Sequence, residues 1–124
     1  MFPTMPTNRD LRERTIVFAV AIIQFCRELP RTAEGRHIGG QLLRAGTGVA
    51  ANYRAVCRSR SRADFIAKLG TVIEEADESD FWMEVAVRSN VSSGVTVVEL
   101  RAEANELVAI FTQSQKTARE NGKR

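Results

Sequence analysis

The stretch TVVELRAEANELVAIFTQS, residues 96–114, decides the fold class, because its apolar side chains recur at alternating spacings of three and four. Thr96, followed three residues later by Glu99, is typical of a capping box at the start of a helix. The stripe that would face a core consists of Val97, Leu100, Ala104, Leu107, Phe111 and Ser114. No alternating strand pattern competes with this spacing. We therefore expect a helix over about 96–119 and an all-α fold.

Three further helices are expected upstream, over about 9–29, 33–58 and 62–89, because turn signals separate three segments of similar length. Pro30 ends the first segment by denying the next turn a hydrogen-bond donor. Thr32 and Ser61 are the expected N-caps of the other two, and Asp64 favours the positive end of the third helix. Four helices joined by short loops predict one domain over 1–124, an antiparallel up-down-up-down four-helix bundle.

The expected core follows from helical spacing in these three segments. It consists of Leu11, Phe18, Ile22, Phe25 and Leu29, then Ile38, Leu42, Ala45, Val49, Tyr53 and Val56, then Phe65, Leu69, Val72, Ile73, Ala76, Met83 and Val87. Cys26 and Cys57 also occupy apolar positions without C-x-x-C spacing, so we interpret them as reduced core thiols.

The first helix is apolar nearly all round, because Ile16, Val17, Val20 and Ile23 add to its core stripe. One neighbouring helix cannot cover all of these side chains, so this surface belongs in a core or an interface. The apolar run over 15–26 is shorter than the roughly 20 residues that a membrane-spanning helix needs. The N-terminus also lacks the order of regions found in a signal peptide. We expect a cytoplasmic protein with no membrane partner.

Charge is segregated along the 124 residues, although the net charge is only +3. Residues 27–68 carry nine basic side chains against three acidic ones, whereas residues 74–106 carry nine acidic ones against two basic ones. This asymmetry suggests an anionic partner for one surface, although solvated faces and neighbouring subunits also produce it.

Residues 46–51, GTGVAA, match the G-x-G-x-x-A fingerprint of dinucleotide-binding folds. That fingerprint requires a preceding strand, a helix that begins within it, and an acidic residue roughly 20 positions later. Residues 37–44 instead continue a helical pattern, and residues 66–71 contain no carboxylate. The glycines are therefore expected in the middle of a helix, with Gly46 turned toward the core, and no cofactor is expected.

The outer face of that helix is made of small residues edged with arginine. Glycine inside a helix is unfavourable, so several glycines suggest the close approach of another backbone. The expected oligomer interface consists of Gly40, Thr47, Gly48, Ala51 and Ala55, together with Trp82 from the next helix. A bulky residue in place of Ala51 should break the oligomer before it unfolds the bundle.

Three linked motifs resemble a known family. They are QLLRAGTGVAANYRA at 41–55, DFIAKL at 64–69 and EEADESDFWME at 74–84. They look like the pattern Q-L-x-R-A-x-x-S-[IV]-x-x-N-[IY]-x-E, F-x-x-x-L and E-A-x-E-[ST]-x-[FY]-W of bacterial four-helix-bundle proteins encoded in intervening sequences of 23S ribosomal RNA genes. The match covers about residues 10–118. Gly48 replaces the usual serine and Ala55 the usual glutamate, so no role of those two side chains is carried over.

The resemblance implies an antiparallel four-helix bundle that assembles as a ring-like homopentamer without established enzymatic activity. It also implies a similarity to the accessory variability proteins of diversity-generating retroelements, which are thought to bind nucleic acid and a reverse transcriptase through a basic surface. The location in ribosomal RNA genes suggests RNA by association only.

A basic surface is expected around the junction of the second and third helices. The candidate nucleic-acid-binding residues are Arg54, Arg58, Arg60, Arg62 and Lys68, with Arg36 and Arg44 on the outer face of the second helix. Binding would be electrostatic and nonspecific, because no sequence-reading module is present. Either RNA or DNA would bind in this way. The alternatives are that these charges are solvated or pair with the third helix, and that the oligomer is a scaffold docking a protein partner.

The acidic run of the third helix suggests neither a metal site nor an enzyme. Its members are Glu74, Glu75, Asp77, Glu78, Asp80 and Glu84. Di-metal bundles use Glu-x-x-His pairs, but His37 lies in another helix with no glutamate three residues before it. His37 also lacks an activating Ser, Cys or Asp motif around it. Under the family resemblance, these carboxylates pair with arginines of the second helix or of a neighbouring subunit, where unlike patches suit a head-to-tail ring.

Overall fold

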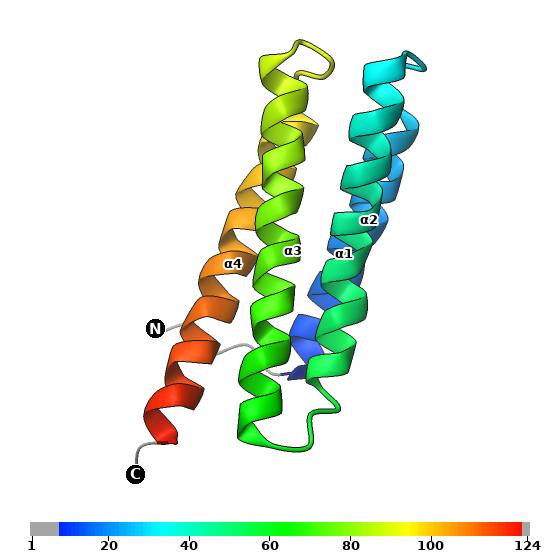
Figure 1. Cartoon of the computed structure of the whole chain (residues 1–124). Helices are drawn as coiled ribbons and strands as arrows, with labels where there is room; N and C mark the ends of the chain where they lie inside the picture. The colour runs from blue at the N-terminus through cyan, green and yellow to red at the C-terminus, as the bar shows by residue number, and fades with distance from the viewer. Residues whose placement is uncertain (1–7, 123–124) are drawn as a thin grey trace.

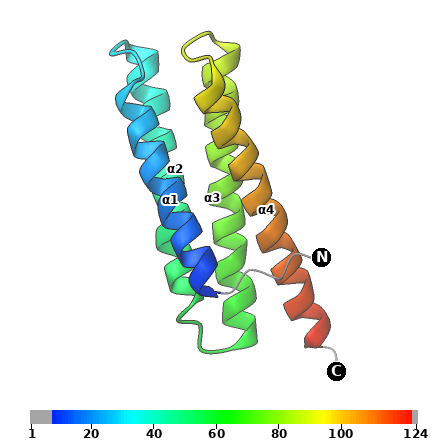
Figure 2. The same cartoon turned by 180° about the vertical axis from the view of Figure 1, so that it is seen from behind.

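The structure, a computed structural model, describes residues 8–122, and four helices account for most of them. They are α1 (Asn8–Arg27), α2 (Ala33–Val56), α3 (Arg62–Arg88) and α4 (Val95–Asn121). The helices run alternately up and down, as Figure 1 and the reverse view in Figure 2 show. The predicted all-α, up-down-up-down bundle is therefore confirmed, and each helix boundary lies within two residues of its predicted position.

Two of the three predicted helix caps are present. The Thr32 hydroxyl accepts a hydrogen bond from the Gly35 N–H at 3.1 Å, and the Ser61 hydroxyl accepts one from the Asp64 N–H at 3.0 Å. The predicted capping box at Thr96 is wrong. α4 begins one residue earlier, at Val95, and its N-cap is Gly94, which has a φ of 105° and forms no side-chain cap. Glycine supplies this left-handed backbone, which sets the chain's entry into α4 without a capping side chain.

The core contains the predicted stripes. Every core position predicted for the first two helices is buried, whereas Phe65, Ile73 and Val87 of α3 lie half-buried at the edge of the core. Both cysteines are free thiols and only half-buried. The predicted core lacks four residues whose side chains are buried: Thr15, Ala19, Ser79 and Ala86. Ser79 is fully buried, and its hydroxyl donates to the Glu75 carbonyl at 2.8 Å, which satisfies the polar group within its own helix.

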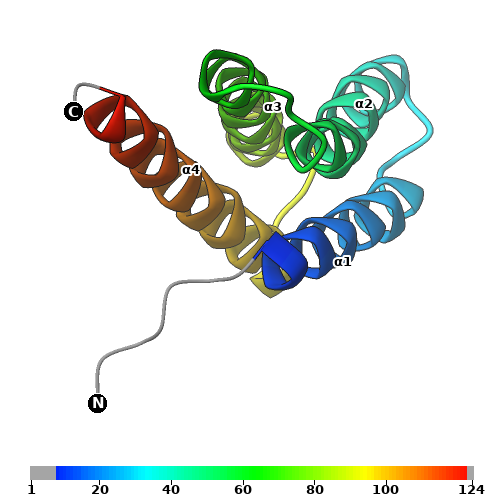
Figure 3. The ribbon, with the colours of Figure 1, turned by 90° about the horizontal axis from the view of Figure 1, so that it is seen from below.

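α1 and α4 contact each other over a shorter stretch than any other neighbouring pair of helices. Figure 3, a view along the bundle, shows that the axes of α1 and α4 diverge. Between the two helices, Arg14 forms two hydrogen bonds to the Glu103 carboxylate, at 2.7 and 2.8 Å, and a 3.0 Å ion pair with Glu106. Because packing there is sparse, Val17 and Val20 of α1 remain exposed. The expectation that one neighbour cannot cover α1 is therefore confirmed.

Candidate nucleic-acid interface and assembly surface

The junction between α2 and α3 is ordered by one carboxylate. Asp64 Oδ2 pairs with Lys68 Nζ at 2.9 Å and accepts a hydrogen bond from the Arg60 backbone N–H at 3.3 Å. The bond from Lys68, followed by the bond from Arg60, lowers the pKa of the Asp64 carboxyl. Asp64 therefore holds the turn and neutralises Lys68, and it forms no ion pair with an arginine side chain of the described residues.

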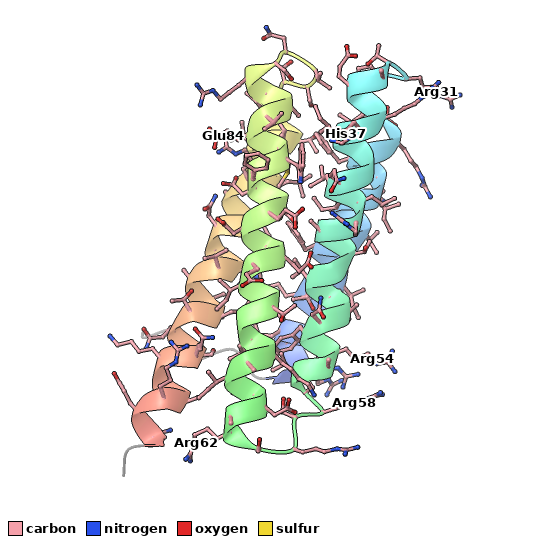
Figure 4. The ribbon with its side chains drawn as sticks, in the orientation of Figure 1. Arg31, His37, Arg54, Arg58, Arg62 and Glu84 are labelled. Atoms are coloured by element: carbon pink, nitrogen blue, oxygen red, sulfur yellow. The ribbon has the colours of Figure 1, made fainter. Side chains whose placement is uncertain are left out.

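A shallow hollow of about 720 Å³ opens beside this junction. Ala51 and Ala55 contribute small apolar side chains to it, while Arg54, Arg58 and Arg60 contribute positive charge. Figure 4 shows the side chains of Arg54 and Arg58 projecting outward from the same end of α2. We call Arg54, Arg58, Arg60, Arg62 and Lys68 the basic end of the molecule.

The arginines of this end differ from four arginines elsewhere in the bundle. Arg14, Arg44, Arg88 and Arg101 each form an ion pair with a carboxylate. Among residues 8–122, no such pair involves any of the four arginines of the basic end, Arg54, Arg58, Arg60 and Arg62. Arg54, Arg58 and Arg60 line the same hollow, so their charges sum to a positive potential there, and that potential attracts anions. Arg62 projects on the other side of this end, beside Gly122 at the end of α4 (Figure 4).

Two of the predicted nucleic-acid-binding residues lie away from the basic end. Arg36 is near the start of α2, at the opposite end of the bundle. Arg44 is in the middle of α2, where its guanidinium lies 3.7 Å from the Glu78 carboxylate. Helical periodicity placed both on the outer face of α2, but it does not reveal that a helix of 24 residues separates its ends by about 35 Å.

Sequence reasoning missed Arg12 of α1. This exposed arginine lines a second hollow, of about 220 Å³, together with Ile16, Ala50, Ala51 and Arg54. α1 begins beside the end of α2 because the two helices are antiparallel, so Arg12 extends the basic end toward α1. Only the antiparallel register, which depends on tertiary packing, brings Arg12 and Arg54 together.

The predicted interface residues of α2 occupy different surroundings. Gly40 and Ala51 are exposed, while Thr47 and Ala55 are half-buried. Gly48 is also half-buried, and a Cβ built on it would lie 2.9 Å from Glu75 Oε2 of α3. Its missing side chain leaves room for the Glu75 carboxylate within the chain. No second backbone approaches Gly40 within the described chain, so the role of this surface in assembly stays a prediction.

An apolar stripe on α1 adjoins this part of α2. Ile16, Val17 and Val20 are 50%, 57% and 46% exposed, and Leu43 of α2 is 40% exposed. Apolar side chains gathered on one face indicate an interaction surface more strongly than scattered ones do. We call Ile16, Val17, Val20 and Leu43 the apolar stripe.

Trp82 is half-buried between α2 and α3. Its indole N–H donates to Glu78 Oε1 at 3.3 Å, and its ring meets the edge of the His37 ring with centroids 5.5 Å apart. The neighbouring Phe81 is 52% exposed and packs edge-on against Trp82, with centroids 5.0 Å apart. Phe81, and not Trp82, is thus the more exposed aromatic of the two. Helical periodicity alone did not predict an exposed role for Phe81.

The acidic run of α3 is divided among several partners. Asp80 and Glu84 contact Arg101 of α4 at 2.7 and 3.5 Å, and Glu84 also contacts Arg88 at 3.1 Å. Partial burial, with the neighbouring Glu78 as the next cause, raises the pKa of Glu75. Within residues 8–122, no three His, Cys, Asp or Glu side chains gather as metal ligands would. None of the described helices has the length and apolarity needed to cross a bilayer.

Comparisons with known proteins agree with this architecture. A sequence model of the 23S rRNA-intervening sequence protein family matches residues 8–113. A crystal structure of a protein of unknown function from the S23 ribosomal protein family of Bacteroides thetaiotaomicron superposes with a TM-score of 0.81 at 27% sequence identity. That superposition covers 88% of this chain and 97% of the other. No curated protein matches the chain significantly.

Proposed function

The chain belongs to the 23S rRNA-intervening sequence protein family, and we propose that it is a non-enzymatic, self-assembling bundle whose basic end binds the phosphate backbone of RNA or DNA. The proposed assembly is a homopentamer, as the family resemblance implies. The proposed location is the cytoplasm, where both nucleic acids would be accessible.

The grouping of three arginines without an ion pair around one hollow carries the binding proposal. Arg54, Arg58 and Arg60 line this open hollow and form no ion pair among the described residues, unlike Arg14, Arg44, Arg88 and Arg101, which each contact a carboxylate. Binding to phosphates would release counterions from the nucleic acid, and no internal ion pair would first have to break. Contacts of this kind bind the nucleic-acid backbone and do not distinguish one base sequence from another.

Self-assembly would multiply the affinity of one basic end. The apolar stripe supports assembly, because a monomer leaves these side chains of α1 and α2 in water. Copies held in one ring present several basic ends to one strand, so the second contact becomes intramolecular and the overall affinity rises without any new kind of contact.

Charge reversal at the basic end tests the binding proposal. We expect the double variant Arg58→Glu and Arg60→Glu to lose at least about tenfold in affinity for fluorescein-labelled RNA at low salt, because two phosphate contacts become repulsions. Arg88→Glu is the control, since this exposed arginine lies at the far end of α3. Fluorescence anisotropy measures both, and light scattering checks that each variant keeps the wild-type mass.

Two results would contradict the proposal. Equal affinities for the double variant, the Arg88→Glu control and the wild type would contradict binding through the basic end. A wild-type protein that assembles but binds neither RNA nor DNA at low salt would instead favour the alternative, a scaffold that docks a protein partner.

A further inference from the structure

A third hollow, of about 680 Å³, lies between the last turns of α1 and the first turns of α2. We call it the α1–α2 hollow. Its lining combines apolar side chains, such as Ile23 and Leu43, and glycines, such as Gly40, with three arginines at the rim, Arg27, Arg31 and Arg36. None of its lining residues, all within 8–122, carries a carboxylate. The hollow therefore suits an apolar group that arrives with negative charge around it.

Gly40 keeps this hollow open, although the fold of one chain does not require glycine there. A Cβ built on Gly40 meets no atom within 4 Å. Glycine inside a helix is less stable than alanine, because it loses more backbone freedom on folding. Within the described chain nothing uses the space that the missing side chain leaves, so a group from outside the chain is the natural occupant.

Phe81 on α3 has the matching character. It is 52% exposed, and its neighbours on the outer face of α3 include the exposed carboxylates Glu74 and Asp77. Glu84, one turn further along the same helix, is already paired with Arg88 and Arg101. An apolar ring beside two exposed carboxylates is complementary in both respects to an apolar hollow with an arginine rim.

The register of α2 against α3 places the Phe81 ring and the α1–α2 hollow at a similar position along the bundle axis. The contact between His37 and Trp82 fixes which residues of the two helices lie level. Phe81 is one residue from Trp82, and Gly40 is three residues from His37, so their heights along the bundle differ by no more than about 5 Å. Figure 4 shows His37 and Glu84 near the same end of the molecule, and Arg31 beyond them.

We propose that Phe81 of one copy inserts into the α1–α2 hollow of a second copy, beside Gly40, with Glu74 and Asp77 facing the arginine rim. The contact joins unlike patches, so every copy offers one ring and one hollow, and the association continues head to tail until it closes. This inference rests on the proposed self-assembly and identifies the surfaces that would form it.

Two substitutions remove the two halves of the contact separately. Phe81→Ser deletes the ring, and Gly40→Leu fills the hollow. The chain itself has room for the new leucine side chain, because a Cβ at Gly40 meets open space, and losing a helical glycine favours the fold. Val98→Ser is the matched control, since Val98 is 65% exposed on α4 and lies outside both patches. Circular dichroism and thermal melting confirm that each variant is folded.

Native mass spectrometry gives the decisive result. We expect wild type and Val98→Ser to form the same oligomer, and Phe81→Ser and Gly40→Leu to be monomers when each is alone. Their equimolar mixture should form a 1:1 dimer and nothing larger, because one variant keeps an intact hollow and the other an intact ring.

Three outcomes would overturn the inference. If either variant alone keeps the wild-type mass, the contact is not the one used, while the proposed self-assembly stands. A mixture that contains only monomers shows that the two patches do not bind each other. A wild-type protein that is itself a monomer overturns the proposed self-assembly as well.

Discussion

Four glycines of α2 meet four different surroundings. A Cβ at Gly35 would collide with the Pro30 carbonyl oxygen, and one at Gly46 would lie 2.7 Å from the Ile22 side chain. Gly48 faces the Glu75 carboxylate, and Gly40 faces open space. At Gly46, the absence of a side chain permits α1 and α2 to approach closely, and at Gly35 it leaves room for the backbone of the connection between them. At Gly40 it has no such role within the chain.

Alanine at two of these positions should therefore act in opposite directions. Gly46→Ala should destabilise the bundle by about 1–3 kcal/mol, because the added methyl overpacks against Ile22 in a filled core. Gly40→Ala should stabilise it by about 0.5–1 kcal/mol, since it removes the cost of a helical glycine without meeting a neighbour. Urea unfolding of the two variants, which differ from the wild type by one methyl each, measures both. Equal effects at the two positions would contradict the packing described.

Cys26 should be slow to react with alkylating reagents. Burial raises the pKa of its thiol to about 11, and the thiol lies 3.5 Å from the Gly39 carbonyl. The thiolate is the reactive form, and the raised pKa makes it scarce at pH 8. We therefore expect Cys26 to be alkylated roughly 100-fold more slowly at pH 8 than a thiol with an ordinary pKa. Iodoacetamide labelling followed by peptide mass spectrometry compares Cys26 in folded and urea-unfolded protein. Equal rates in the two states would show that the thiol is not shielded.

At the scale of elements, α2 and α3 meet across a polar seam as well as a core. Glu75 lies in this seam against Gly48, and Arg44 contacts Glu78 one turn further along α3. Burial, followed by the nearby carboxylates, raises the pKa of Glu75, so its ionised form is less stable in the bundle than in the unfolded chain.

Replacing Glu75 with glutamine should raise stability at pH 7. The folded-state pKa is raised, so the wild type has its full stability below the ordinary carboxyl pKa of about 4.3 and loses part of it as the pH rises through the folded value. The gain of Glu75→Gln should be under about 1 kcal/mol, because the group is partly solvated. Thermal melts from pH 3 to pH 8 should show the gain vanish at the acid end. A gain that is independent of pH would exclude ionisation as its cause.

Periodicity predicted the helices because each buried stripe repeats within a single element. Leu42, Val72 and Leu107 can be assigned to the core from local spacing alone, and all three are fully buried. Features that depend on two elements could not be predicted in this way. The pairing of Arg44 with Glu78 requires the register of α2 against α3, and the start of α4 depends on the backbone of Gly94 in the preceding turn. The exposed position of Phe81 depends on the same register, since Trp82 takes the place next to α2.

At the scale of the whole molecule, charge segregation along the sequence becomes separation in space. Carboxylates of α3 and α4 neutralise arginines in the middle of the bundle, such as Arg14 and Arg101. The basic end keeps its positive charge, and the α1–α2 hollow carries a second arginine rim at the opposite end. In the proposed assembly, the arginine rim of the α1–α2 hollow contacts a second copy, and the basic end stays accessible to nucleic acid.

The salt dependence of RNA binding by the wild-type assembly measures whether the arginines of the basic end contact the phosphate backbone. Four unneutralised arginines at the basic end predict that log K falls with log salt concentration with a slope of magnitude about 3 or more, since each phosphate contact contributes about 0.7–0.9. RNAs of the same length and different sequence should give the same slope and affinity within about threefold, because no base contact is involved. Binding that is absent at low salt, or that does not weaken as salt rises, would contradict the account.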